Sequence, residues 1–456
     1  MAPFKVAIIG GGMTGLTAAL HLDRLGIDFV LLEAYDDLTP EVGASLALYP
    51  NFQRVVDQLG VLDEVHRESS EIAHISCHDI DGNLKYQHDV LDQLHEATGG
   101  YGIRTWTRAQ LLKVLYGNAS ENGKSKMLTG QRVSRIEQLP NDEGVRVHVE
   151  GGKTHDVDLV IGADGTHSIV RSEMWRMAEE DKSQVFKNDK GEDSNTQFAC
   201  VFGLSTNTGD LQKDVAYQVS GKDMTIGVFG GAKGEALWFV FFQADAERSK
   251  HRGLDAPRFT PEEGLEICQK YSGAKLTDKT NFGDVFANRH RITTQACPNH
   301  CLKRWHYGRL ICLGDSVAKT NPILAQGGAQ GAEGVVMLID QIHEALQQGD
   351  GKTSLSSTEV DTILARVNKA RYARVSAAVN KSQQIIQISA WSNWLFRFVG
   401  KYVTPLLPTW IFVGQALGQW KGSYVSTSLP AATGPSKTEA GATAGAKAVD
   451  GASDSE

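Results

Sequence analysis

Cysteine is scarce in this sequence, with six residues among 456. A secreted domain that relies on disulfides has a far higher cysteine density, so a disulfide scaffold is excluded. Excess positive charge is absent too: the formal net charge is −8, which argues against a nucleic-acid-binding protein. Cys297 and Cys301 lie near three histidines, but the spacing fits no common zinc pattern, so we predict no metal site.

Long uninterrupted apolar runs are also lacking. The run "VAIIGGG" from Val6 is much shorter than a secretory signal, so we predict a cytoplasmic protein that is not secreted. The segment 391–420 is rich in Trp, Phe and Leu, but Pro405 and Pro408 interrupt it, and a spanning helix is not expected. Two interpretations stay open for this segment: helices packed on the body of the protein, or association with a membrane surface.

Length and a hydrophobic fraction of 41% suit two intertwined domains. Strand and helix patterns alternate at the N-terminus and return near residue 310, which predicts an α/β fold whose first domain is completed late in the sequence. The middle of the chain predicts an antiparallel sheet, with "GGAKGE" (230–235) as a hairpin turn rather than a nucleotide loop. The expected strands are 4–9, 29–32, 157–161, 198–204, 215–219, 224–229, 236–243 and 310–313, and the expected helices are 16–25, 108–116, 328–346 and 358–388.

The motif "GGGMTG" follows the first expected strand and precedes the first expected helix. Gly10, Gly12 and Gly15 form the G-x-G-x-x-G pattern of dinucleotide sites. Gly10 permits a tight turn, Gly12 lets the backbone approach a pyrophosphate, and Gly15 lets the helix pack on the strand. Glu33 ends the second strand, where a carboxylate binds ribose hydroxyls and disfavours the 2′-phosphate of NADP. The motif predicts a bound dinucleotide without choosing between NAD and FAD.

Two further strand ends carry glycine and aspartate. "GADGTHSIVR" places Asp164 after one buried strand, and "LGDSVAK" places Asp315 after another. Because ligands bind at the carboxyl ends of such strands, we expect both aspartates at the dinucleotide site, with Asp315 accepting hydrogen bonds from ligand hydroxyls. A helix N-cap is the alternative role for Asp315. Gly327 and Gly328 open a helix, so their N–H groups suit an anion or a ring carbonyl.

With "EVGASLALYPN" from Glu41, "TRAQLLKVLY" from Thr107 and "CVFGLS" from Cys200, these motifs make the chain resemble the group A flavoprotein monooxygenases of the aromatic-hydroxylase type. The resemblance is closest to fungal FAD-dependent monooxygenases of indole-diterpene, meroterpenoid and prenylated indole-alkaloid pathways, the paxilline type. The predicted organisation is a Rossmann-like FAD-binding domain (1–75, 100–180 and 286–348), an inserted antiparallel β-sheet substrate domain (76–99 and 181–285), a C-terminal helical region (349–426) and a disordered tail (427–456).

Residue roles follow from the resemblance. It implies that FAD contacts Gly10, Gly12, Gly15, Glu33 (adenosine ribose), Ala47 (through its backbone), Arg108 (pyrophosphate region), Asp164, Asp315 (ribitol and phosphate) and Gly328 (isoalloxazine). Tyr217 in "VAYQVSG" is the implied catalytic residue, as a hydrogen-bond donor to the substrate; the alternative is a sheet residue whose hydroxyl contacts water. The aromatic residues expected to divide between pocket and core are Phe198, Phe202, Phe229, Trp238 and Phe239.

The chain departs from these relatives at several positions. Ala318 stands where they usually have histidine, and Ala329 where they usually have asparagine. Ala199 stands where many have an arginine that is a proposed catalytic acid in some of them. The missing arginine argues against an acid-assisted rearrangement through that position, but not against FAD binding.

The activity implied by the resemblance is that of an FAD-dependent monooxygenase with NADPH and O2 as co-substrates. A hydroperoxide at the flavin C4a carbon would epoxidise or hydroxylate a hydrophobic polycyclic indole-alkaloid or terpenoid intermediate of fungal secondary metabolism, and an indole epoxide would then be free to rearrange. Two alternatives remain: an FAD-dependent reductase or dehydrogenase of the same fold, and a degenerate flavoprotein without turnover.

Overall fold

The structure is a computed structural model that describes residues 3–41, 45–140, 143–206, 209–231, 234–348 and 352–435. A six-stranded sheet carries the N-terminal strand pattern. Its strands, in spatial order, are β18 (His306–Tyr307), β19 (Leu310–Cys312), β12 (Leu159–Gly162), β1 (Lys5–Ile9), β2 (Asp28–Leu32) and β8 (Met127–Leu128). All neighbouring strands are parallel except β18 and β19. Strands from three distant parts of the chain are thus adjacent, so the predicted late completion of this sheet is confirmed.

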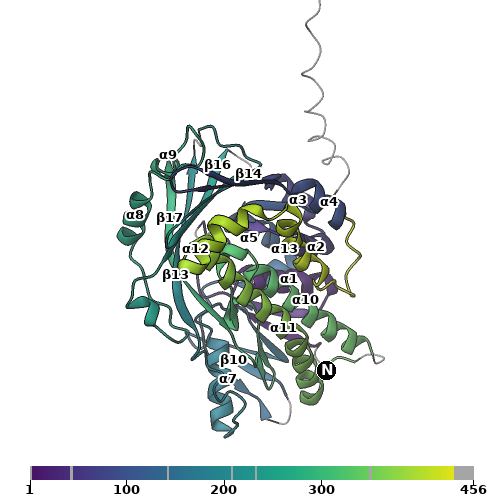
Figure 1. Cartoon of the computed structure of the whole chain (residues 1–456). Coiled ribbons are helices and arrows are strands. Elements are labelled where there is room, and N and C mark those ends of the chain that lie inside the picture. Colours follow the sequence, from purple (N-terminus) through teal and green to yellow (C-terminus); the bar gives the residue numbers. More distant parts are fainter. Residues whose placement is uncertain are drawn as a thin grey trace, which may run out of the picture.

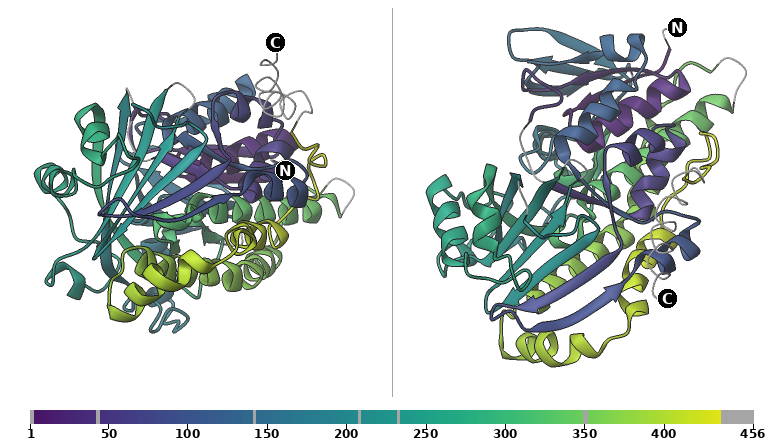
Figure 2. Two further views of the ribbon diagram at one scale, coloured as in Figure 1. Left: turned by 45° about the horizontal axis from the view of Figure 1, so that its top comes forward. Right: turned by 90° about the horizontal axis from the view of Figure 1, so that it is seen from above.

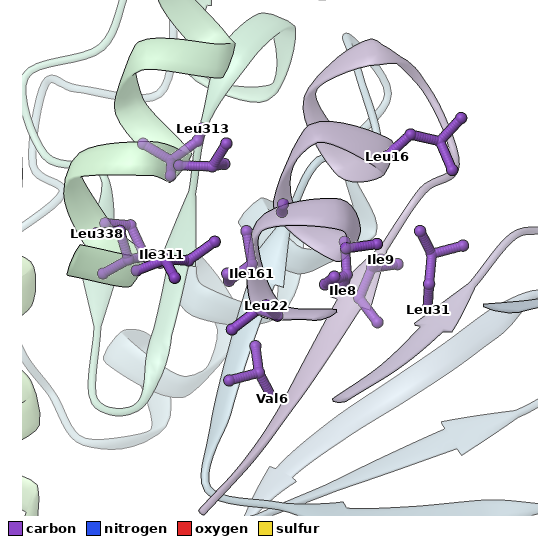
Figure 3. Close-up of a cluster of buried hydrophobic side chains, with 14 of the residues drawn as sticks. Val6, Ile8, Ile9, Leu16, Leu22, Leu31, Ile161, Ile311, Leu313 and Leu338 are labelled. Atoms are coloured by element: carbon purple, nitrogen blue, oxygen red, sulfur yellow. The ribbon is translucent and has the colours of Figure 1, made fainter. Parts of the chain in front are cut away.

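Helices pack beside this sheet and form the main core with it. α1 (Met13–Leu25) and α10 (Gly327–Gln347) pack on each other, and α5 (Arg108–Gly117) packs on α1. Apolar side chains of β1, β12 and β19 meet Leu22 of α1 and Leu338 of α10 in a fully buried cluster (Figure 3). Each such buried side chain contributes about 1.5–3 kcal/mol. The core therefore holds the strand ends in a fixed position.

An eight-stranded sheet forms the second large unit (Figure 1). Its order is β20 (Ala318–Lys319), β17 (Arg289–Cys301), β13 (Asn195–Thr206), β16 (Glu235–Gln243), β15 (Met224–Gly230), β14 (Val215–Gly221), β5 (His74–Asp79) and β6 (Leu84–Asp89). The pairs are antiparallel except β14 with β5. α8 (Pro261–Lys270) and α9 (Phe282–Ala287) cover one face, where Trp238 packs on Phe282 and Phe286.

Smaller elements complete the fold. Two three-stranded sheets are formed by β11 (Thr154–Val157), β10 (Val145–Val149) and β9 (Val133–Gln138), and by β3 (Ser45–Leu48), β7 (Ile103–Thr107) and β4 (Ser70–Ile72). The short helices are α2 (Pro50–Gln58), α3 (Leu62–Arg67), α4 (Leu91–Thr98), α6 (Glu121–Ser125) and α7 (Ile169–Glu180).

The C-terminal helices run back across the molecule. α11 (Ser357–Ser389) packs on α10, and α12 (Trp394–Phe398) leads through irregular helical turns into α13 (Thr409–Lys421). α13 begins beside β6 of the large sheet (Figure 2). There the Phe412 ring lies 4.2 Å from the His88 ring, centroid to centroid. Within the described ranges, no helix combines the length and the apolar character needed to cross a membrane.

Two expectations need correction. β17, which the predicted organisation placed in the FAD-binding domain, belongs to the eight-stranded sheet, because it pairs with the sequence-distant β13. Residues 427–435, predicted to be disordered, contact the body of the protein: Gln58 Nε2 donates to the Pro430 carbonyl at 3.1 Å, and the Thr427 N–H donates to Asp340 Oδ2 at 2.9 Å. Low-complexity composition does not reveal such contacts. Residues 436–456 lie outside the described residues.

Candidate active site

Three strand ends meet at one edge of the six-stranded sheet. The Ala163 N–H donates to the Ile9 carbonyl at 2.8 Å, and the Leu313 N–H donates to the Gly162 carbonyl at 2.9 Å. β1, β12 and β19 therefore end side by side, as the prediction required. The glycine loop after β1, Asp164 after β12 and Asp315 after β19 come together at the carboxyl edge, where ligands bind in open α/β sheets.

At each of the three motif positions of the first loop, glycine is present for a different structural reason. Gly10 has a φ of +102°, and a Cβ there would lie 2.6 Å from the Ala163 carbonyl oxygen. At Gly15 a Cβ would lie 1.9 Å from the Gly10 carbonyl oxygen, so this glycine allows α1 to pack on the loop. A Cβ at Gly12 would be 3.7 Å from Arg108 Nη2 and would meet nothing closer. The protein leaves space in front of Gly12, as a phosphate-binding loop requires.

The N-termini of α1 and α10 are packed tightly together at this edge. A Cβ at Gly328 would lie 1.2 Å from Met13 Cε, and a Cβ at Gly331 would lie 2.3 Å from Thr14 Oγ1. Two helix N-termini with unpaired N–H groups thus face the same region, and each favours negative charge. The expectation that a helix opens at Gly327–Gly328 is confirmed.

Carboxylates border the loops. Glu33 Oε2 accepts the Gly11 N–H at 2.6 Å, and Oε1 accepts the Tyr35 N–H at 2.9 Å, so the carboxylate is fixed at the end of β2. Asp164 Oδ2 accepts the Val170 N–H at 3.1 Å, while its other oxygen, Oδ1, is buried without a hydrogen-bond partner among the described residues. Burial raises the pKa of Asp164. A buried acceptor of this kind suits a ligand hydroxyl or N–H.

A cation lies between these carboxylates. Arg108 begins α5 and makes no hydrogen bond or ion pair within the described part of the chain. Burial lowers its pKa, and the charges of Glu33 and Asp315 oppose that shift. Asp315 is paired with Lys319. Burial acts to lower the pKa of Lys319, but the Asp315 carboxylate outweighs it and raises that pKa. Arg108 is thus available to pair with a pyrophosphate. Lys319 would contact both Asp315 and a bound ligand.

A cavity of about 1740 Å³ connects this edge with the eight-stranded sheet. The predicted cofactor-binding residues that line it are Gly10, Gly12, Glu33, Ala47, Arg108, Asp164, Asp315 and Gly328. Gly15 is not among the lining residues, because its role is to pack α1 against the loop. Ala329 also lines the cavity, whereas Ala318 is buried outside its lining. The cavity therefore collects eight predicted residues from distant parts of the sequence.

Tyr217 also lines the cavity, and the catalytic role that the resemblance implies for it stays a prediction. Its ring belongs to the core cluster on the face that α8 and α9 cover. The hydroxyl oxygen accepts the Gln212 N–H at 3.0 Å, so it is held by the backbone outside the sheet face of Ala216 and Gln218. Side chains alternate between the two faces of a strand, and the residue pattern of this strand does not distinguish the faces.

The substrate part of the cavity is aromatic. Phe202, Phe229 and Phe239 line it, whereas Trp238 lies in the α8–α9 core and Phe198 in a cluster with Ile386 of α11. The prediction that the aromatics divide between pocket and core is confirmed. Sequence reasoning missed lining residues from the same sheet and from the C-terminal helices, namely Gln218, Phe241, Gln295, Ile388, Leu407, Phe412 and Gln415. The uncharged stretch between Lys401 and Lys421 was the only signal for the last three.

The donor set fits a dinucleotide: open space before Gly12, two helix N-termini, an unpaired arginine and fixed carboxylates at two strand ends. The family model described as "FAD binding domain" matches residues 3–370. The FAD-dependent monooxygenase dpmaE of Metarhizium anisopliae is 33% identical over 406 residues, which are 88% of this chain and 82% of that protein. The FAD-dependent monooxygenase olcE of Penicillium canescens is 31% identical over 404 residues, 88% of this chain and 84% of that protein.

Solved structures share the fold. HpxO of Klebsiella pneumoniae, in complex with FAD and uric acid, has a TM-score of 0.71 at 20% identity and covers 92% of this chain and 97% of its own. The p-nitrophenol 4-monooxygenase PnpA of Pseudomonas putida DLL-E4 has a TM-score of 0.71 at 17% identity. The match covers 92% of this chain and 99% of that structure. The predicted fold class, a Rossmann-like FAD-binding domain with an inserted sheet, is confirmed. The chain belongs to the FAD-binding domain family and is an FAD-dependent monooxygenase, similar to those of fungi.

Proposed function

We propose that the enzyme acts in the cytoplasm and uses NADPH and O2 to epoxidise or hydroxylate a hydrophobic polycyclic intermediate, an indole alkaloid or a terpenoid, in a pathway of the paxilline type. The observation that carries this proposal is the shape and lining of the cavity, which runs from the glycine loops to Phe202, Phe229 and Phe239. An apolar, aromatic wall suits a polycyclic substrate better than a small charged acid.

Three glutamine side chains contribute polar groups to the substrate part. Gln218 lies on β14, Gln295 on β17 and Gln415 on α13, and all three line the cavity. Their amide groups can orient a substrate by hydrogen bonds without adding charge. The aromatic wall and the covering C-terminal helices exclude water from the same region. These side chains position the substrate.

FAD, when bound, would supply the reduction of O2 and the transfer of one oxygen atom to the substrate. The protein's part is then to bind the pyrophosphate through Arg108 and the Gly12 backbone, and to fix the ring system near Gly328. Within the described residues, one strand–glycine–helix unit of the dinucleotide type is present. We therefore expect NADPH to dock transiently rather than in a second nucleotide domain.

A spectroscopic experiment tests the proposal. We expect the purified protein to carry yellow FAD whose absorbance bleaches with NADPH under anaerobic conditions and recovers when air is admitted. A polycyclic indole or terpenoid should accelerate NADPH oxidation, and labelled O2 should place one labelled atom in the product. Bleaching without oxygen incorporation for any substrate that is converted would assign a reductase or dehydrogenase instead. A protein that cannot be reconstituted with FAD would leave the degenerate flavoprotein as the explanation.

A further inference from the structure

Exposed apolar side chains are concentrated in one short segment. Eight of the thirteen large hydrophobic residues that are exposed in the described ranges lie between Trp394 and Ile411. We name this set the α12–α13 face; its residues are Trp394, Leu395, Phe398, Tyr402, Val403, Leu406, Trp410 and Ile411. Trp394 and Leu406 are about as exposed as side chains in an unfolded chain, at 80% and 81%. Contiguous apolar surface of this kind marks an interaction site.

The chain segment that carries this face has charge of one sign. The chain has a formal net charge of −8, yet residues 362–438 contain nine Lys or Arg and no Asp or Glu. Arg397 lies within the α12–α13 face and is exposed, and Lys401 stacks its ammonium over the Tyr402 ring, 5.7 Å from its centroid. Neither forms an ion pair within the described residues. A basic apolar surface on an acidic protein fits a negatively charged partner.

The opposite side of the same segment is firmly packed. The Phe412 ring contacts the His88 and Tyr86 rings at centroid distances of 4.2 and 5.1 Å, and His88 Nδ1 lies 3.0 Å from Thr409 Oγ1. At the far end of α13, Arg374 Nη2 donates to the Gln419 carbonyl at 2.5 Å. The segment is therefore already seated on the body of the protein, and its exposed side remains for an external partner.

The segment also forms a wall of the cavity. Thr404, Leu407, Ile411 and Phe412 line it, and Ile411 is in addition 36% exposed. One thin layer of α12–α13 residues thus separates the aromatic part of the cavity from the exposed face. A ligand dissolved in whatever covers that face would have a short path to the substrate region.

We propose that the α12–α13 face binds an anionic lipid surface. Tryptophan and tyrosine beside leucine and phenylalanine, with lysine and arginine among them, is the composition of segments that lie in a membrane interface. The helices are expected to lie on the lipid surface, since none of those described is both long and apolar enough to span a bilayer. Resting on the proposed function, this docking would let a hydrophobic polycyclic substrate pass from the lipid to the cavity without crossing water.

Vesicle flotation of the purified protein tests the docking without substrate or turnover. We expect binding to phosphatidylcholine vesicles that contain about one third phosphatidylserine, and weaker binding to phosphatidylcholine alone or at high salt. The variant Trp394→Ser/Leu406→Ser/Trp410→Ser should reduce vesicle affinity at least tenfold, because each large apolar side chain loses its place in the lipid. Arg397→Glu/Lys401→Glu should reduce affinity for the anionic vesicles by about fivefold per removed cation, or more.

Matched controls keep the test specific. Val185→Ser removes an exposed apolar side chain elsewhere, and Lys153→Glu/Lys187→Glu reverses two exposed cations elsewhere. Both should bind vesicles as the native protein does. None of the substituted residues lines the cavity, so FAD content and its bleaching by NADPH should stay unchanged in every variant. This readout separates failure of the docking from failure of the proposed activity.

Several outcomes would overturn the proposal. The native protein would remain unbound in every vesicle preparation, or the serine variant would float as well as the native protein. A native dimer that the serine variant converts to monomers, without vesicle binding, would assign the face to a second copy of the chain. A vesicle interaction that is insensitive to phosphatidylserine and to Arg397→Glu/Lys401→Glu would contradict the electrostatic part.

Discussion

At the scale of single residues, His300 on β17 is the clearest source of acid sensitivity. Both of its ring nitrogens are buried and lack a hydrogen-bond partner among the described residues. Burial lowers its pKa to about 4, and the nearby charge of Arg171 acts in the same direction. In the unfolded chain a histidine has a pKa near 6.5, so protons bind the unfolded state first as pH falls below that value. The folded state is therefore destabilised progressively from about pH 6.5 down to about pH 4.

The substitution His300→Leu removes this penalty. Urea denaturation gives the unfolding free energy of the variant and of the native protein at pH 5 and at pH 8. We expect the difference, variant minus native, to be about 2 kcal/mol larger at pH 5 than at pH 8. An identical pH dependence in the native protein and the His300 variant would refute the assignment.

At the scale of elements, the first glycine loop allows packing and cofactor binding to be separated. Gly15→Ala forces a Cβ to within 1.9 Å of the Gly10 carbonyl oxygen, so the loop or α1 must shift. Gly12→Ala puts a Cβ into space that the protein leaves open, 3.7 Å from Arg108. We expect Gly15→Ala to lower the unfolding free energy by about 1–3 kcal/mol. Gly12→Ala should leave the unfolding free energy of the apoprotein within about 0.5 kcal/mol of the native value. The same substitution should weaken FAD binding at least tenfold.

Thermal unfolding of the apoprotein and fluorescence titration with FAD give the two quantities. Gly117→Ala is the control, because it lies at the end of α5 and its Cβ would meet nothing within 4 Å. It should leave both quantities close to the native values. Normal FAD affinity in Gly12→Ala would mean that the open space before this loop is not the pyrophosphate site.

The sequence predicted the parts of the site that local chemistry determines. A glycine loop between strand and helix, and aspartates at strand ends, have a fixed geometry, so Glu33, Asp164 and Asp315 were located correctly at one edge. The face of a β-strand is less determined when both sides of the sheet are covered by protein. The sequence therefore did not show that the Tyr217 ring packs in the α8–α9 core while its hydroxyl accepts the Gln212 N–H, and its catalytic role stays a prediction. The α13 wall of the cavity depends on long-range packing that no local pattern encodes.

At the scale of the whole molecule, one buried carboxylate joins the C-terminal helices to the cofactor domain. Glu333 on α10 is fully buried and accepts hydrogen bonds from Arg371 Nη1 at 2.7 Å and Arg374 Nε at 3.1 Å, both on α11. It also accepts from Asn51 Nδ2 on α2 at 2.8 Å. Asn51 donates in turn to Gln326 at 3.1 Å, directly before the helix that begins at Gly327. The network thus links α11 to the loop that faces the cavity.

Replacing this carboxylate should loosen that link throughout the molecule. In Glu333→Gln the two arginines keep their charge in a buried site without a counter-charge, so we expect a loss of about 3 kcal/mol in unfolding free energy. Because Arg374 also donates to the Gln419 carbonyl of α13, limited proteolysis should cut the C-terminal region of the variant faster. Glu344→Gln, an exposed carboxylate on the same helix that accepts from Thr427 Oγ1 at 2.8 Å, should cost less than about 1 kcal/mol. Equal losses in the two variants would show that the Glu333 network does not fasten the C-terminal helices.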